Sequence, residues 1–190
     1  VDGPVPDVDR SDYLLMLGAN PLVSNGSIMT APGIKRRLQA LQRRGTLVVV
    51  DPRRTETAAM ADEHLAIKPG GDAFLLAAIA QVLFAEDRLR LRRLAGFTAG
   101  LDEVRRLTEP FAPDVVASHV GLDAEVIRRV ARALSEAKRP CIYGRLGVCT
   151  QRYGGRNGWL VNVLNVLGGA VDHQAGMTFP SPAVGRVAPA

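Results

Sequence analysis

The sequence predicts an α/β fold built on an open, mainly parallel sheet with helices on both faces. Short, uncharged apolar runs bounded by turn residues are typical of buried parallel strands, and they lie at 13–17 and 46–50. Between them Ile34, Leu38 and Leu41 recur at the spacing of one helix face. Strands that alternate with helices in this way indicate a sheet covered on both sides.

The first 51 residues are predicted to form one βαβ unit. Residues 1–10 contain two prolines and are expected to be an extended lead-in. The strand at 13–17 stops at a cluster of turn residues over 18–26. Basic residues cover the outer face of the helix that follows, and Gly45 is placed to end that helix as its C′ residue.

Two further strands, three helices and a small helical insertion follow along the chain. A third strand is predicted at 64–68, and a helix that is apolar almost all round runs from Asp72 to about Glu86. A charge-rich stretch and two prolines indicate a small helical insertion outside the sheet. The remaining predictions are this insertion over about 87–121, a helix through 126–134 capped by Asp123, a fourth strand at 140–143, and a helix from 159 to 167.

The charge balance permits an anionic partner but does not select one. The chain of 190 residues has 24 Lys and Arg against 19 Asp and Glu, a net charge of +5. This surplus fits an anionic ligand, a nucleic-acid face, or solvated helix faces rich in arginine. Aromatic residues are not interleaved with the basic ones, so we expect no nucleic-acid partner.

Membrane insertion and metal binding by this chain are not indicated. The longest apolar run, around 74–84, is too short to span a bilayer, and the first nine residues do not resemble a targeting segment. Cys141 and Cys149 fit no metal spacing and are expected to be buried free thiols of a cytoplasmic protein. The histidines are scattered, so we predict no catalytic residue and no metal ligand here.

The loop after the first strand is a candidate binding loop, because ligands of open α/β sheets bind beyond the carboxyl ends of the strands. Gly18 would let a phosphate or sugar approach the backbone, Asn20 can donate and accept hydrogen bonds, and Ser24 adds a hydroxyl. Only Gly18 of the three dinucleotide-fingerprint glycines is present, which disfavours ordinary NAD binding. The alternative is a tight Asn20-Pro21 turn without a ligand.

Carboxylates follow the second and third strands. Asp51 is placed where an acidic residue accepts hydrogen bonds from a ribose, and Arg53 could pair with phosphate. The alternative is an Asx-type turn at Asp51, before Pro52, with solvated arginines. Asp72 is expected to cap the helix that it starts, and its carboxylate could also accept two parallel hydrogen bonds from guanine, which adenine cannot offer.

The loop after the fourth strand, 144–151, is rich in glycine. Gln151 could form a hydrogen bond with a ring system, and Arg145 could bind an anion. The alternative is an ordinary βα loop whose glycines adopt positive φ.

Taken in order, these motifs resemble the molybdopterin-dependent oxidoreductases of the dimethyl sulfoxide reductase superfamily, most of all its formate-dehydrogenase-like and assimilatory-nitrate-reductase-like members. The motifs are 12–21, 50–58 with 61–62, 67–72, and 144–151 with 162–165, followed by Gly169, Asp172 and Gly176. The resemblance covers about 11–178. It implies one Rossmann-like domain over 1–178, with 179–190 as a tail or linker.

The resemblance also implies a cofactor, bis-molybdopterin guanine dinucleotide with molybdenum or tungsten, and this domain would bind one of its guanosine arms. By position, it would place Gly18, Asn20, Pro21 and Ser24 along the pyrophosphate and ribose, Asp51, Pro52 and Arg53 at the ribose and base edge, Gly71 and Asp72 at the guanine, and Leu146 and Gln151 toward the pterin and metal. At Cys149-Thr150 the motif is one residue longer than its commonest form.

Members of this family also carry parts that this sequence does not contain. These are an N-terminal cysteine cluster for a 4Fe-4S centre, a cysteine, selenocysteine or serine that ligates the metal, and a C-terminal domain for the second dinucleotide. We therefore expect a central fragment of a longer enzyme, inactive alone, whose partners are the remaining domains and an electron-transfer subunit. The full-length enzyme would carry out a two-electron oxidation or reduction of a small substrate of the formate or nitrate type.

Two other interpretations compete with this one. A related non-catalytic domain occurs in the large iron–sulfur subunit of NADH–quinone reductase, where the cofactor residues would be relics. Against it, Asn20, Asp51, Asp72 and Gln151 are all intact. The other is a Rossmann-like domain of a thiamine-diphosphate enzyme or a basic binding module, and the missing diphosphate motif argues against the former.

Overall fold

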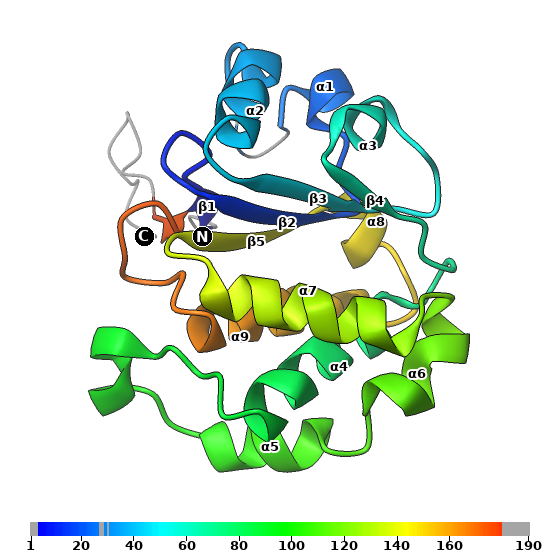
Figure 1. Cartoon of the computed structure of the whole chain (residues 1–190), viewed down its shortest axis with the longest axis vertical. Coiled ribbons are helices and arrows are strands. Elements are labelled where there is room, and N and C mark those ends of the chain that lie inside the picture. The colour runs from blue at the N-terminus through cyan, green and yellow to red at the C-terminus, as the bar shows by residue number, and fades with distance from the viewer. Residues whose placement is uncertain (1–3, 27–28, 30, 180–190) are drawn as a thin grey trace, which may run out of the picture.

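A parallel sheet forms the middle layer of the structure (Figure 1). The computed structural model describes residues 4–26, 29 and 31–179. In that part of the chain the sheet has the strand order β4-β3-β2-β5, and every neighbouring pair is parallel. The strands are β2 (Tyr13–Leu17), β3 (Thr46–Val50), β4 (Glu63–Leu65) and β5 (Pro140–Gly144).

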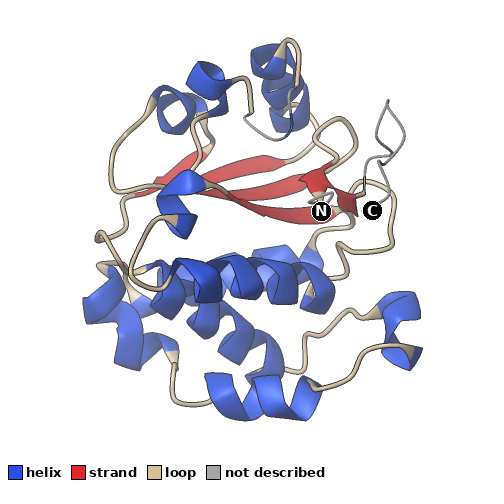
Figure 2. Cartoon of the chain, turned by 180° about the vertical axis from the view of Figure 1, so that it is seen from behind, coloured by secondary structure: helices blue, strands red, loops and turns tan. Residues whose placement is uncertain are grey.

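Helices cover both faces of the sheet, which confirms the predicted fold class (Figures 1 and 2). One face carries α1 (Pro21–Ser24), α2 (Ile34–Gln42) and α3 (Glu56–Met60), and the other carries α4 (Asp72–Ala85), α7 (Ala124–Glu136) and α9 (Gly154–Leu167). The expected helices outside the sheet are η2 (Arg92–Gly96), α5 (Leu101–Thr108) and α6 (Pro113–Val120). None of the described helices is long and apolar enough to cross a membrane.

Each sheet face has its own apolar core, because successive strand residues point to opposite sides. Leu14 and Met16 of β2 pack in a cluster with Leu38 of α2, whereas Leu15 and Leu17 belong to the cluster around α4, α7 and α9. Helix α4 is buried on nearly all sides, as its sequence predicted. The strands are therefore buried on both faces, which explains why their sequences are continuous apolar runs.

The third strand is shorter than predicted. The expected range was 64–68, but β4 ends at Leu65. The N–H of Ile67 turns back to the carbonyl of Leu65 at 3.0 Å, and the N–H of Lys68 bonds to the carbonyl of Val120 at 2.8 Å. The backbone donors that would extend the strand are therefore used elsewhere.

The prediction for Gly45 was wrong, and so was the alternative interpretation of the glycines after β5. Gly45 is not the C′ residue of α2, which already ends at an Arg43 cap; instead, a Cβ on Gly45 would lie 1.9 Å from the carbonyl oxygen of Asp12. In the loop after β5, Gly144 and Gly147 do not adopt positive φ, and 146–149 form the short helix α8 (Leu146–Cys149). Close approach of another backbone segment requires glycine at Gly45 and Gly147, whereas a Cβ on Gly144 would meet the side chain of Val161 at 3.0 Å.

The remaining differences lie at the ends of elements. Cys141 is buried as expected, but Cys149 is exposed. Helix α9 begins at Gly154, five positions before the predicted 159. The lead-in contains β1 (Val5–Pro6), which pairs antiparallel with the unpredicted β6 (Met177–Thr178). Of the predicted tail, residues 180–190 lie outside the described residues.

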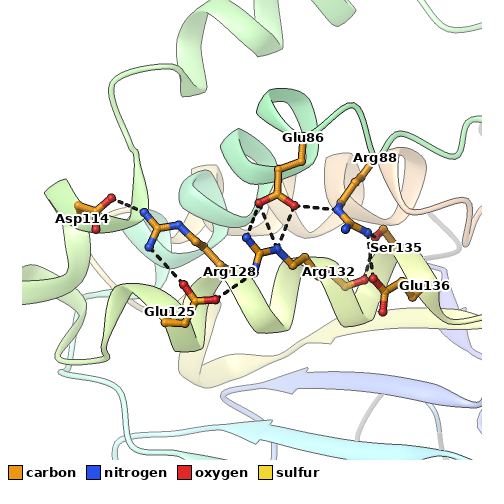
Figure 3. A network of polar contacts seen from close by, with 8 residues as sticks. All are labelled: Glu86, Arg88, Asp114, Glu125, Arg128, Arg132, Ser135 and Glu136. Carbon is orange, nitrogen blue, oxygen red and sulfur yellow. Dashed lines mark hydrogen bonds and ion pairs between the residues drawn. The ribbon is translucent and has the colours of Figure 1, made fainter.

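Arginines on α7 are paired within the chain (Figure 3). Glu86, at the end of α4, accepts hydrogen bonds from Arg132 at 2.8 Å and from Arg88 at 2.8 Å. The Arg132 guanidinium lowers the pKa of Glu86 to about 2. Arg128 and Arg132 also contact Glu125. This part of the positive surplus joins α4 to α7 and is not presented to an anionic partner.

The charge-rich stretch 88–93 holds the C-terminal end of α7. Arg90 donates to the carbonyl of Ser135 at 2.9 Å, and Arg92 donates to the carbonyl of Lys138 at 2.9 Å. Guanidinium groups satisfy the unpaired carbonyls of a helix end and interact favourably with its dipole.

Asn165 on α9 closes the open edge of β5. Its Oδ1 accepts from the N–H of Ile142 at 2.9 Å, and its Nδ2 donates to the carbonyl of Ile142 at 2.8 Å. The side-chain amide thus replaces the neighbouring strand that β5 lacks on that side. These two hydrogen bonds explain why a polar residue, Asn165, lies in an otherwise apolar segment of α9.

Replacing Asn165 with Leu should lower the free energy of unfolding by about 2–4 kcal/mol, because the buried N–H and carbonyl of Ile142 would lose their partners. Urea unfolding followed by circular dichroism measures the loss. The matched control is Asn162→Leu, at an exposed position of the same helix, with an expected change within about 0.5 kcal/mol. Equal effects of the two substitutions would contradict this role for Asn165.

Candidate functional site

The strand order creates a crevice between β2 and β5. These two strands are neighbours, with Leu17 level with Gly144, but the chain leaves them toward opposite faces of the sheet. After β2 it runs to α1 and α2, and after β5 to α8 and α9 (Figure 1). Ligands of open α/β sheets bind at such a switch point, beyond the carboxyl ends of the strands.

The two loops at this point meet backbone to backbone. The N–H of Gly147 donates to the carbonyl of Gly18 at 3.0 Å. A Cβ on Gly18 would lie 2.6 Å from the backbone nitrogen of Val148, and one on Gly147 would lie 2.7 Å from the Cα of Gly18. Gly18 also has a φ of +55°. The close approach that was expected of a phosphate or sugar is made here by the loop after β5.

Beside this contact lies a hollow of about 250 Å³, which we call the switch-point crevice. It is smaller than the roughly 300–1,000 Å³ of small-molecule sites, so it can hold only part of a dinucleotide. Tyr143 donates to the carbonyl of Gly26 at 2.9 Å, and burial raises the pKa of this phenol to about 12. The lining residues are Gly18, Ala19, Asn20, Pro21, Val23, Ser24, Gly26, Tyr143, Arg145 and Leu146.

Asn20 joins the loop after β2 to the start of α3. Its Oδ1 accepts from the Thr57 hydroxyl at 2.7 Å, and its Nδ2 donates to Glu56 at 2.7 Å. Ser24 donates to the carbonyl of Asn20 at 3.2 Å. The Asn20-Pro21 turn is therefore supported within the protein, and Asn20 lies on the crevice wall with its side chain already hydrogen-bonded.

Asp51 forms the Asx-type turn that was the alternative interpretation of this position. Its Oδ1 accepts from the N–H of Arg53 at 2.9 Å. The ring Nε2 of His64 lies 2.8 Å from the carbonyl oxygen of Asp51. Pro52 and Arg53 are exposed, and Arg53 lies 3.9 Å from Glu56. One carboxylate oxygen of Asp51 is thus used locally.

Asp72 does not cap α4 with its side chain. The N-cap is Gly71, and Asp72 is the first helical residue, with 3% of its surface exposed. Its Oδ2 accepts a hydrogen bond of 2.6 Å from Nε2 of Gln151. Burial raises the pKa of Asp72, the hydrogen bond from Gln151 opposes this shift, and the charge of Asp51 adds to it.

The predicted site residues fall into two adjoining groups. Five of them line the switch-point crevice, namely Gly18, Asn20, Pro21, Ser24 and Leu146. The others, at Asp51, Pro52, Arg53, Gly71, Asp72 and Gln151, do not line it. The groups are connected, because Gln151 also donates to the carbonyl of Gly147, which contacts Gly18.

Several residues that shape the site were not predicted. Gly147, Tyr143, Glu56 and Thr57 act through contacts with positions far away in the chain. The repeated glycines after β5 are the only local signal, and their sequence does not show which distant backbone they approach. Among the described residues, no group of three or more His, Cys, Asp or Glu could hold a metal ion.

Comparison with known proteins identifies the family of this domain. The sequence profile of molybdopterin oxidoreductases matches residues 2–174. The chain belongs to the molybdopterin oxidoreductase family. It is 33% identical over 152 residues to formate dehydrogenase H of Escherichia coli (strain K12), covering 80% of this chain and 20% of that protein. It is 34% identical over 150 residues to the assimilatory nitrate reductase of Haloferax mediterranei, covering 77% and 20%. The predicted family and its formate-dehydrogenase-like and nitrate-reductase-like members are thus confirmed.

The fold comparison agrees with the sequence comparison. Acetylene hydratase from Pelobacter acetylenicus superposes with a TM-score of 0.82 at 25% identity, over 95% of this chain and 24% of that one. The chain therefore spans about a fifth to a quarter of the length of these family members. Since one of them is named a hydratase, this domain alone does not specify the reaction.

The burial of Asp72 predicts how stability depends on pH. An acid whose pKa is raised by folding destabilises the folded state when ionised, and this cost disappears as pH falls through the folded pKa toward the unfolded value near 3.9. Asp72→Asn should therefore be at least as stable as the parent at pH 7, with the difference closing toward pH 4. Urea unfolding at several pH values measures this. Asp102→Asn, at an exposed position, controls for the lost charge, and a marked destabilisation by Asp72→Asn at pH 7 would contradict the expected sign.

Proposed function

We propose that this domain binds one guanosine arm of bis-molybdopterin guanine dinucleotide within a longer molybdopterin oxidoreductase. The observation that carries the proposal is the buried carboxylate of Asp72, which already accepts an amide N–H at the carboxyl edge of the sheet. A carboxylate with this environment can accept the ring N–H and exocyclic amine of guanine. Family membership supports a molybdopterin cofactor, and the carboxylate supports its guanine dinucleotide form.

The arrangement of the other residues fits such a ligand. Gly71 and Asp72 would hold the guanine, and Asp51 with Pro52 and Arg53 would hold the ribose and base edge. The switch-point crevice is too small for the whole dinucleotide but suits a phosphate and sugar. Asn20 and Ser24 form the polar part of its wall, and Pro21 forms an apolar part. Gly18 allows the loops after β2 and β5 to meet.

Leu146 and Gln151 were assigned to the pterin side of the cofactor, and the geometry supports this for Leu146 only. Leu146 is 62% exposed at the rim of the switch-point crevice. The amide nitrogen of Gln151 is engaged by Asp72 and by the carbonyl of Gly147. We therefore propose that Leu146 faces the pterin. Gln151 would instead contribute to the guanine site, through its hydrogen bond to Asp72.

The chemistry would come from the cofactor, which supplies two-electron transfer when bound. This domain contributes position and hydrogen bonds, so we propose that the chain does not turn over alone. The whole protein would oxidise or reduce a small substrate of the formate or nitrate type, in line with two of its relatives. Its partners would be the remaining domains, with their 4Fe-4S centre, and an electron-transfer subunit.

One relative favours keeping a second candidate. The menaquinone reductase, molybdopterin-binding-like subunit of Nitratidesulfovibrio vulgaris is 28% identical over 97% of this chain. Its name fits the alternative of a non-catalytic domain like that of NADH–quinone reductase, in which the site residues are relics. A guanine-specific site would argue against that alternative.

Titration calorimetry of the 190-residue chain with nucleoside diphosphates tests the proposal. GDP should bind, ADP should bind at least about tenfold more weakly, and IDP, which lacks the exocyclic amine, should fall between them. Asp72→Asn should weaken GDP binding about tenfold or more and leave ADP binding unchanged. Equal affinities for GDP and ADP, or no effect of Asp72→Asn, would refute the guanine assignment, and Asp102→Asn serves as the matched control.

A further inference from the structure

Asp72 and Gln151 lie 79 positions apart in the sequence but in direct contact. Gln151 follows α8 and precedes α9, whereas Asp72 starts α4. The amide nitrogen of Gln151 donates one hydrogen bond to Oδ2 of Asp72 at 2.6 Å and another to the carbonyl of Gly147. Both N–H groups of this amide are therefore hydrogen-bonded, and one of them donates to the carboxylate that is proposed to bind guanine.

This contact covers the carboxylate. Asp72 is only 3% exposed, so the edge of a purine base cannot reach both of its oxygens while the surrounding side chains keep their positions. Asp72 is buried, whereas Gln151 itself is partly exposed. It is also the residue whose side chain can leave by rotation about its own torsions, since its backbone belongs to a bend between two helices.

The chemistry of the contact matches that of the expected ligand. A glutamine amide and the exocyclic amine of guanine are both N–H donors, and either satisfies the same carboxylate oxygen. Exchange of one donor for the other keeps Oδ2 of Asp72 hydrogen-bonded. Adenine presents an acceptor at the corresponding ring position and can donate from its exocyclic amine only, so its entry would leave one oxygen of the carboxylate without a donor, which is costly in a buried site.

We propose that Gln151 is a displaceable internal substitute for guanine: its side-chain amide occupies Asp72 in the ligand-free protein and is exchanged for the base on binding. This inference rests on the proposed function. It assigns Gln151 a role in specificity, because only a base that brings its own donors can replace the amide. It also predicts a cost, since binding must first release Gln151 from Asp72 and from Gly147.

The test is the substitution Gln151→Ala in the 190-residue chain, with nucleotide binding measured by calorimetry. Removal of the competing amide should tighten GDP binding about three- to tenfold, because a larger fraction of the protein then has Asp72 available. ADP binding should not tighten in parallel. Gln39→Ala, at an exposed position on α2, should leave both affinities unchanged.

The outcomes separate this inference from the proposed function. If the parent binds GDP but Gln151→Ala binds it equally or more weakly, Gln151 is a ligand or a support for Asp72, and the exchange is refuted while the guanine site stands. If neither protein binds GDP, although both unfold cooperatively on heating, the proposed function and the exchange fail together. If Gln151→Ala increased the affinities for GDP and ADP equally, the exchange would also be refuted. That result would show that the Gln151 side chain only blocks access to Asp72 and does not select the base.

Discussion

The backbone contact between Gly18 and Gly147 is the constraint on which the rest of the site depends. It brings together the loops after β2 and β5, two neighbouring strands whose chains continue on opposite faces of the sheet. A side chain at either position would collide with the other loop. The contact also places Gly147 where its carbonyl accepts from Gln151, which in turn reaches Asp72. One continuous set of contacts thus runs from β2 and β5 to the start of α4.

This arrangement brings polar residues from four loops to the edge of the sheet where the proposed ligand would bind. The parallel strands end on the same side of the sheet, so Asn20, Asp51, Asp72 and Gln151 all lie at its carboxyl edge. Asn20 ties the loop after β2 to the start of α3, and the charge of Asp51 reaches Asp72. The ion pairs of α7 join it to Glu86 at the C-terminal end of α4, whereas Asp72 lies at the start of that helix (Figure 3).

The sequence predicted those features that depend on local pattern. Continuous apolar runs identified β2, β3 and β5, and the all-apolar stretch identified α4, because burial on every side leaves a clear compositional signal. Features that depend on distant partners could not be predicted. The end of β4 depends on a carbonyl of Val120, the glycine at 45 on a carbonyl of Asp12, and the side chain of Asp72 on Gln151.

The central claim is that residues at the ends of four strands bind a single guanosine-bearing ligand. Mapping of backbone amide chemical shifts by NMR during titration with GDP tests it most directly. We expect the perturbed amides to cluster at 18–24, 51–53, 71–72 and 146–151, with the same dependence on GDP concentration in all four segments. Perturbations confined to one of these loops, or centred on the opposite edge of the sheet, would contradict it.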